Sequence, residues 1–283
     1  MSGIIFGGTA VSANRNYLIN PNFEVVQGTA SGTLANSNAL PTASVGYSGK
    51  TNWYEGATGG TPAYAYSAVN ESVTFTGAAS TTNIYFGQRI ESRDIVTLTN
   101  RLATVTLSVE LSNSLLTSVT WEVFRATTTD DTHGTIGTPT QTSIASGTFT
   151  VNSVLTRYSA TFSLPALASR GLDIRFRVGA QTSGTWVIAR PQLEEGSTAT
   201  TFLSDNYTTE LSKCQRHYTA ATMRVGPAAS FATTYTFPST MFAVPVRTGG
   251  GTGYSVGLLN EFGISHAQTT AADQALTFSA HIP

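Results

Sequence analysis

The stretch Trp186–Tyr218, WVIARPQLEEGSTATTFLSDNYTTELSKCQRHY, decides the fold because its apolar residues change period partway along. Up to Leu193 they alternate with small or polar residues, as in a strand with one buried face. After the polar turn Glu194–Thr198 they recur with spacings of four, three and four, at Tyr207, Leu211, Cys214 and Tyr218. That is the period of one helix face. The stretch therefore predicts a strand that closes a domain, followed by a short helix.

The predicted helix spans residues 205–218. Asp205 or Asn206 can cap its first turn, and Glu210 complements the positive end of the helix dipole. A helix of about three turns is not stable alone in water. Its narrow apolar stripe must therefore pack either against the rest of its own chain or against copies of itself around an axis.

A family resemblance rests on short motifs that occur in a fixed order along the chain. They are Asn16–Glu24, Gln88–Glu91, Thr156–Ser159, Pro191–Gly196, Ala199–Phe202, Glu210–Leu211, Cys214–Tyr218 and, further on, Phe237–Pro238 with Met241 and Pro245. Together they resemble a module of bacteriophage tail fibres and receptor-binding tail proteins. In that family a carbohydrate-binding-module-like sandwich ends in a P/V-Q-L-E-x-G strand, and a short helix carrying C-Q-R-Y-Y follows. His217 stands here where the family usually has tyrosine.

The resemblance implies a homotrimer in a phage tail that attaches the virion to a host-surface polysaccharide or lipopolysaccharide. Residues 1–16 lie almost wholly outside it; they are either a frayed terminus or a peptide that docks onto a baseplate or tail protein through Ile4, Ile5 and Phe6. The first residues have no basic region and make a poor signal peptide. We expect synthesis in the host cytoplasm and release by lysis.

Composition excludes several classes of function. Charged residues make up 11% of the 283 residues, under half of the usual fraction of about 25%. The net charge of −1 argues against a nucleic-acid partner, which demands clustered Lys and Arg. No stretch approaches the ~18 apolar residues that span a membrane, so we expect no insertion. The single cysteine, Cys214, cannot form an intrachain disulfide, and we expect it to be a small buried hydrophobe.

The fold class predicted is all-β, with an antiparallel jelly-roll β-sandwich over residues 17–204. The alternation is clean in Val105–Leu111 and in Ile174–Val178, where one face is apolar and the other wet. No long helix is expected before residue 205, and the opening and closing strands should lie side by side. Residues 219–283 predict a small β-sandwich that buries too little surface alone. We therefore expect oligomerisation through this tip and the helical neck 205–218, and trimer is the number that the resemblance implies.

Candidate glycan-binding residues are aromatic, because sugars present C–H faces to flat rings and hydroxyls to polar groups. Trp53, Tyr54, Tyr47 and Tyr64 cluster in or beside the long polar interval Gly28–Ala63. An alternative for Trp53 is that it covers the sandwich core. Tyr254 belongs to a second candidate surface, since the turns Gly249–Tyr254 and Asn260–Phe262 are expected at the distal end of the tip.

We expect no catalysis. The four histidines are scattered, and no HExxH motif, Cys–His cluster or G-x-S-x-G elbow occurs. The alternatives are a polysaccharide depolymerase using paired carboxylates such as Glu91 and Asp94, and a purely structural collar protein.

Glu24 is the candidate for a structural calcium site, and no other cofactor is expected. In the jelly-roll modules that open with N-x-x-F-E, the acidic residue often helps to hold such an ion. The Asp pair expected on the closing strand is absent, because Ala189-Arg190-Pro191 occupies that place. An ion pair of Glu24 with Arg190 is the alternative.

Overall fold

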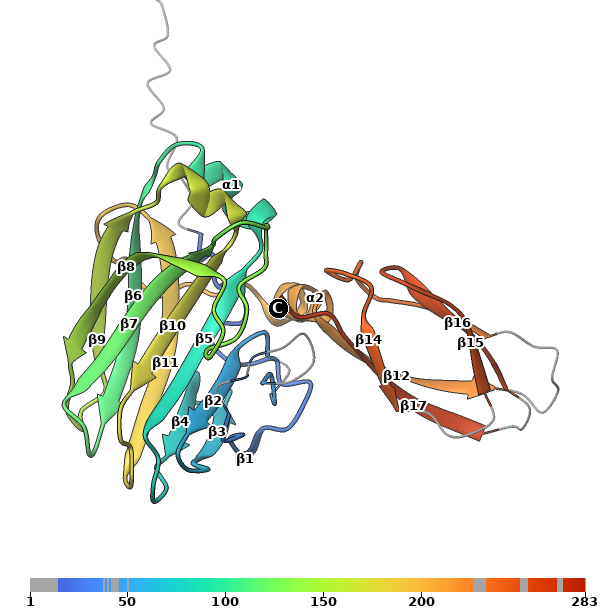
Figure 1. Ribbon diagram of the computed structural model, residues 1–283, viewed down its shortest axis with the longest axis horizontal. Helices are drawn as coiled ribbons and strands as arrows, with labels where there is room; N and C mark the ends of the chain where they lie inside the picture. Colours follow the sequence, from blue (N-terminus) through green and yellow to red (C-terminus); the bar gives the residue numbers. More distant parts are fainter. Residues whose placement is uncertain are drawn as a thin grey trace, which may run out of the picture.

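The computed structural model describes residues 15–37, 39, 41, 46–49, 51–225, 233–249, 254–268 and 272–282. Two β domains lie on either side of helix α2 (Tyr207–Gln215), as Figure 1 shows. The anchors proposed for the docking segment, Ile4, Ile5 and Phe6, lie outside the described residues.

The larger domain consists of two antiparallel sheets. The first has the strand order β1 (Ser31–Thr33), β3 (Ala63–Ser67), β4 (Ser72–Thr76), β11 (Thr185–Glu195), β6 (Thr104–Asn113) and β9 (Thr156–Ser163). The second has the order β2 (Tyr54–Thr58), β5 (Asn83–Ile90), β10 (Leu172–Val178), β7 (Ser118–Ala126) and β8 (Gln141–Thr150). Every pairing between these named strands is antiparallel. The predicted all-β, antiparallel class is confirmed.

One continuous core lies between the two sheets. Alternation places Ile174, Phe176 and Val178 of β10 inside and leaves Arg175 and Arg177 on the outer face. The centre is aromatic: the rings of Trp53 and Phe86 stack with their centroids 4.9 Å apart, and Phe75 packs on both Phe86 and Trp186. Each such side chain contributes about 1.5–3 kcal/mol when it is fully buried.

The opening segment of this domain runs beside its closing strand. Tyr17 donates its backbone N–H to the carbonyl of Leu193 at 2.9 Å, and the Asn16 amide donates to the carbonyl of Pro191 at 3.1 Å. Leu193 N–H in turn donates to Asn16 Oδ1 at 3.1 Å. The expectation that the two ends of the sandwich lie side by side is confirmed.

Two short helices that the sequence did not predict are α1 (Ser92–Thr99) and the 3-10 helix η1 (Ala166–Arg170), which pack against one another. Helix α1 buries Ile95 and Leu98, but its eight residues are too few to establish a period. Its first turn is capped from a distance, because Asp131 accepts hydrogen bonds from Ser92 N–H at 2.7 Å and Ser92 Oγ at 2.9 Å. Because Asp131 is 39 residues from Ser92 in the sequence, the residues around the helix do not predict this cap.

The smaller domain, the tip, has two sheets. One has the order β12 (Tyr218–Val225), β17 (Ala272–Ser279), β14 (Val246–Gly249), and the other β13 (Thr233–Thr236), β16 (Gly263–Gln268), β15 (Tyr254–Asn260). Among the described residues its core cluster holds Phe237, Met241, Ile264, Leu276, Phe278 and Ala280.

The turn Asn260–Phe262 does not lie where the sequence was expected to put it. Met241 N–H donates to the carbonyl of Glu261 at 3.0 Å, and the next residue, Phe242, donates to the carbonyl of Arg216 at 2.9 Å. The turn is therefore near helix α2 and not at the distal end (Figure 1). The direction of a hairpin is set by its packing, which the local residues do not reveal.

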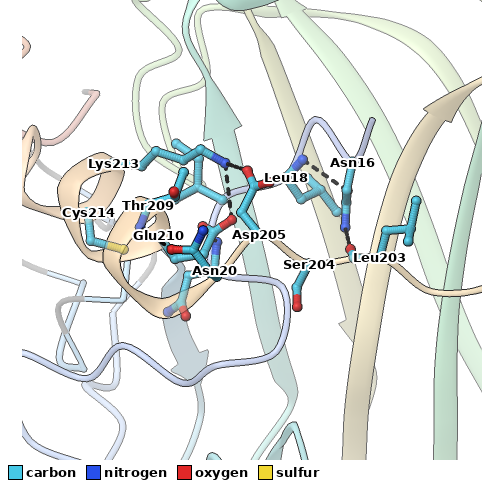
Figure 2. Close-up of polar contacts among 12 residues, drawn as sticks. Asn16, Leu18, Asn20, Leu203, Ser204, Asp205, Thr209, Glu210, Lys213 and Cys214 are labelled. Atoms are coloured by element: carbon cyan, nitrogen blue, oxygen red, sulfur yellow. Dashed lines mark hydrogen bonds and ion pairs between the residues drawn. The ribbon is translucent and has the colours of Figure 1, made fainter. Parts of the chain in front are cut away.

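Helix α2 docks on its own chain, as Figure 2 shows. Of the two residues predicted to cap it, Asp205 or Asn206, the structure has Asn206, which accepts from Thr209 N–H at 3.1 Å. The buried carboxylate of Glu210 accepts from Asn20 N–H at 2.6 Å and from Lys213 Nζ at 3.0 Å. Cys214 is buried, and its thiol donates to the carbonyl of Thr51 at 3.7 Å.

The four neck residues therefore separate into two groups. Cys214 and Tyr218 are buried within the chain, whereas Tyr207 is 48% exposed and Leu211 is half-buried. The helix ends at Gln215, and Tyr218 begins strand β12. The prediction that Tyr218 belongs to the apolar face of the helix is therefore wrong. Of the two partners that the sequence left open for this helix, its own chain covers the Glu210–Cys214 face.

Candidate functional site

The four aromatic residues predicted beside the long loop all lie inside the sandwich domain. Trp53 and Tyr54 are 0% exposed, Tyr47 is 2% and Tyr64 is 4% exposed. A buried ring has no face open to a sugar, so the expectation of an open aromatic platform at these positions is corrected. Trp53 takes the alternative role, filling the core while its indole N–H donates to the carbonyl of Ile19 at 3.0 Å.

Tyr54 belongs to a buried polar network on the outer face of the five-stranded sheet. Its hydroxyl donates to Asp173 Oδ1 at 2.6 Å, and Arg89 Nε lies 3.3 Å from Asp173 Oδ2. Gln141 donates to the same carboxylate. Burial, together with the charge of Asp173, raises the pKa of Tyr54 well above its ordinary value, so its hydroxyl keeps its proton.

Tyr47 connects this network to the tip. Its hydroxyl donates to the carbonyl of Ile282 at 3.2 Å, and its ring stacks on His281 with the centroids 3.7 Å apart. Arg89 Nη1 donates to the same Ile282 carbonyl at 3.0 Å. One end of the outer face is thus covered by residues 281–282.

The other end of this face is open and forms a cavity of about 200 Å³. Its described walls come from four strands and one loop, and they consist of Thr58, Asn83, Tyr85, Glu122, Ile136, Arg175 and Arg177. The strand register brings them together, because Tyr85 lies opposite Arg177, Thr58 opposite Asn83 and Arg175 opposite Glu122. We take this cavity as the candidate site.

Two guanidinium groups and one carboxylate set the charge of the cavity. Arg175 Nε donates to Glu122 Oε2 at 2.9 Å, and the Arg175 guanidinium lies 4.6 Å from the centre of the Phe124 ring. Arg177 Nε is 3.7 Å from the same Glu122 oxygen, and Arg177 Nη1 is 3.4 Å from Asn83 Oδ1. The Arg177 side chain is 43% exposed and that of Arg175 only 11%.

Tyr85 is a wall of the cavity and not a platform, because it is only 1% exposed. Its hydroxyl donates to the carbonyl of Ser37, and it packs with Tyr47 and Tyr54. Burial raises the pKa of Tyr85 to about 12, so the phenol is neutral near pH 7. The groups open to a ligand are therefore the polar ends of side chains such as Arg177 and Asn83, set in walls that are otherwise largely apolar.

Tyr254 and Glu24 lie elsewhere. Tyr254 begins β15, and its side chain lies outside the described residues, as does most of the turn Gly249–Tyr254. Glu24 is exposed and accepts from Asn22 Nδ2 at 3.0 Å. Arg190 pairs with Glu110 and Glu71, which corrects the alternative of a Glu24–Arg190 pair.

Calcium requires six to eight oxygen ligands. Within the described part of the chain, no cluster of three or more His, Cys, Asp or Glu side chains is placed to hold a metal ion. Glu24 would have to find its further ligands among carbonyl and amide oxygens.

The sequence predicted that this sheet has a wet face but did not single that face out as a site. The alternation in Ile174–Val178 predicted a wet face, and this face carries Arg175 and Arg177. The partners Asn83 and Glu122 come from other strands, whose register is not readable from one sequence. Two arginines on the wet side of a single strand were the available signal.

None of the helices in the described ranges is both long and apolar enough to cross a bilayer.

The fold and the cavity define an all-β protein whose larger domain is an antiparallel sandwich with an open cavity on one outer face. No family model matches the chain, and no curated protein matches it. Three solved structures illustrate what it is similar to. A structure described as "CBM4 structure and function" is 15% identical, with 60% of this chain and 97% of that chain covered and a TM-score of 0.39.

The enzymatically active domain of tailspike protein 4 from bacteriophage CBA120 is 15% identical, with 56% of this chain covered and a TM-score of 0.36. The match covers only 21% of that tailspike chain. The N-terminal cellulose-binding domain of Cellulomonas fimi β-1,4-glucanase C is 14% identical, with 52% of this chain and 91% of that chain covered and a TM-score of 0.36.

Proposed function

We propose that this protein is a bacteriophage tail-fibre, receptor-binding protein that attaches the virion to a host-surface polysaccharide or lipopolysaccharide without cleaving it. The observation that carries glycan binding is the open cavity of about 200 Å³ on the outer face of the five-stranded sheet. The ordered motifs from Asn16 to the tip support the phage assignment, through the resemblance that they carry.

The cavity has the chemistry that sugar hydroxyls require. Each hydroxyl both donates and accepts, and the walls offer donors from Arg177 and Asn83 and acceptors from Asn83 and Thr58. The volume is below the roughly 300–1,000 Å³ of sites that enclose a drug-sized ligand. It suits one sugar residue, with the rest of the glycan running over the surface. Affinity per site would be weak.

Several copies on one axis would raise that affinity, because linked sites make later binding events intramolecular. We propose a homotrimer, located in the virion tail and made in the host cytoplasm. Oligomerisation is supported by three exposed apolar residues in the described part of the tip, which are Val244, Val246 and Phe262. Residues 1–16 would dock the fibre onto a baseplate or tail protein.

The proposal is tested by binding the purified protein to host cells and to an array of bacterial surface glycans. The double variant Asn83→Ala, Arg177→Ala removes two cavity walls that carry no core packing. The control, Arg101→Ala, removes an arginine whose side chain is 59% exposed and which pairs with Glu195. Binding should fall with the double variant and stay unchanged with the control. Unchanged binding of the double variant would remove the cavity from the proposal.

Two other functions have distinct outcomes in the same experiment. A depolymerase would release sugar from capsule or lipopolysaccharide and lose that activity on changing Glu91 or Asp94. The Glu91 carboxylate is held on both oxygens by Arg216, at 2.6 and 2.8 Å, which favours a structural role for it. A structural collar protein would bind neither cells nor glycans.

A further inference from the structure

The cavity has an excess of positive charge that its own walls do not neutralise. Among the described residues that line the cavity, Arg175 and Arg177 face one carboxylate, Glu122. The charge of Asp173 also acts on Arg175, but this buried carboxylate is already paired with Arg89. Glu122 is within hydrogen-bonding distance of Arg175, at 2.9 Å, but is 3.7 Å from Arg177 Nε. Beyond about 3.5 Å an N–H and an oxygen no longer form a hydrogen bond, so the attraction that remains is only that of a partly solvated ion pair.

Arg177 retains most of its hydrogen-bonding capacity. A guanidinium has five N–H donors, and within the described part of the chain Arg177 makes one hydrogen bond, the long 3.4 Å contact to Asn83. Its side chain is 43% exposed, and it lines the cavity. The two Nη atoms of a guanidinium match the two oxygens of a carboxylate, which makes arginine a specific ligand for that group.

The aromatic surface that recognises neutral sugars is missing from the described walls of this cavity. Tyr85 is buried, and Phe124 lies beneath the Arg175 guanidinium. A ligand would therefore bind by charge and hydrogen bonds more than by stacking.

Resting on the glycan-binding function proposed above, we infer that the cavity selects an acidic sugar, a monosaccharide that carries a carboxylate, and that Arg177 binds this carboxylate. Glu122 holds Arg175 against the wall of the cavity and leaves Arg177 as the group that meets the ligand. A neutral sugar of the same shape would leave the Arg177 charge without a partner.

The test uses an array in which each acidic bacterial surface oligosaccharide is present both as the carboxylate and after reduction of the carboxyl to an alcohol. Binding to the carboxylate form should be at least about tenfold tighter than to the reduced form, as for a charge-assisted hydrogen-bonded pair. The difference should shrink as the salt concentration rises. Equal binding of both forms would overturn the inference and leave the glycan-binding function standing. No binding to any member of the array would overturn both.

Two variants separate recognition from structure. Arg177→Gln keeps a hydrogen-bond donor and removes the charge, so it should abolish the preference for the carboxylate form; the control Arg101→Gln should keep the preference. Glu122→Gln removes the one negative group of the cavity and should tighten binding of the carboxylate form. Weaker binding in Glu122→Gln would mean that this carboxylate accepts from sugar hydroxyls, and it would overturn the assignment.

Discussion

Arg216 is the residue whose replacement should destabilise the protein most clearly through charge. Its guanidinium holds the carboxylate of Glu91 in a two-point contact, at 2.6 and 2.8 Å, and donates to the carbonyl of Thr240 at 2.9 Å. Glu91 lies between strand β5 and helix α1 and is 4% exposed. Arg216 follows helix α2, so the pair joins the sandwich to the start of the tip.

The expected magnitude follows from what the variant Arg216→Met leaves behind. Methionine keeps much of the apolar stem but leaves a buried carboxylate. Its remaining partners among the described residues are Arg93, a side chain that is 59% exposed, and the His217 imidazole, whose Nε2 lies 3.4 Å from Glu91 Oε1. Burial lowers the pKa of His217 to about 4, so the imidazole is neutral near pH 7 and does not replace the lost charge. Removing one partner of a buried pair costs about 3–5 kcal/mol. Because Arg93 stays 3.0 Å from Glu91, we expect the lower end, about 3 kcal/mol.

The assay is urea unfolding at one protein concentration, followed by tryptophan fluorescence. The three tryptophans, Trp53, Trp121 and Trp186, all lie in the sandwich core, so the signal reports on that domain. The control Arg101→Met breaks an exposed pair with Glu195 and should cost less than about 1 kcal/mol. If Arg216→Met is as mild as this control, the reasoning about a buried pair is refuted. The double variant with Glu91→Gln should recover part of the loss.

Three further outcomes are expected. Leu211→Asp should lower the mass measured by light scattering, and a mass equal to that of the wild type would show that helix α2 does not hold the oligomer. Burial lowers the pKa of His133 and of His217 from 6.5 to about 4. The unfolded chain therefore binds these protons more tightly than the folded one. The free energy of unfolding has its full value above pH 6.5 and falls as the pH drops towards 4, by roughly 3 kcal/mol for each histidine. Asp131 acts in the opposite direction, because burial raises its pKa to about 6, and it offsets part of that loss. The thermal midpoint should therefore fall when the pH is lowered from 6.5 to 4.5, and a midpoint that rises over this range would contradict the reasoning. The Cys214 thiol is buried and its pKa is raised, so an aromatic disulfide reagent should react with it only after unfolding, and rapid reaction in the native protein would place the helix differently.

The parts of the fold that were predictable are those with a local period. The alternation in Val105–Leu111 and Ile174–Val178 identified strands, and Asn206 marked the start of helix α2. The end of that helix was misplaced because Tyr218 continues the spacing of the stripe by coincidence. The backbone there already belongs to strand β12, which pairs with β17.

The burial of Tyr54 was not predictable from its surroundings in sequence. It lies in a polar, glycine-rich interval, yet it forms part of β2 and sits opposite Gly87 of β5. Glycine leaves room for the ring there, since an added Cβ at position 87 would meet the Tyr54 hydroxyl. That complementarity joins residues far apart in sequence, and the candidate cavity depends on the same kind of pairing between strands.

The contact between residues 281–282 and the sandwich has a mechanical consequence. The tip leaves the sandwich through Arg216 and returns to it at Ile282, whose carbonyl receives both Arg89 and Tyr47. A domain tethered twice cannot swing about a single hinge. Tension applied to the tip would load both tethers together and pass directly into the sheet that carries the cavity.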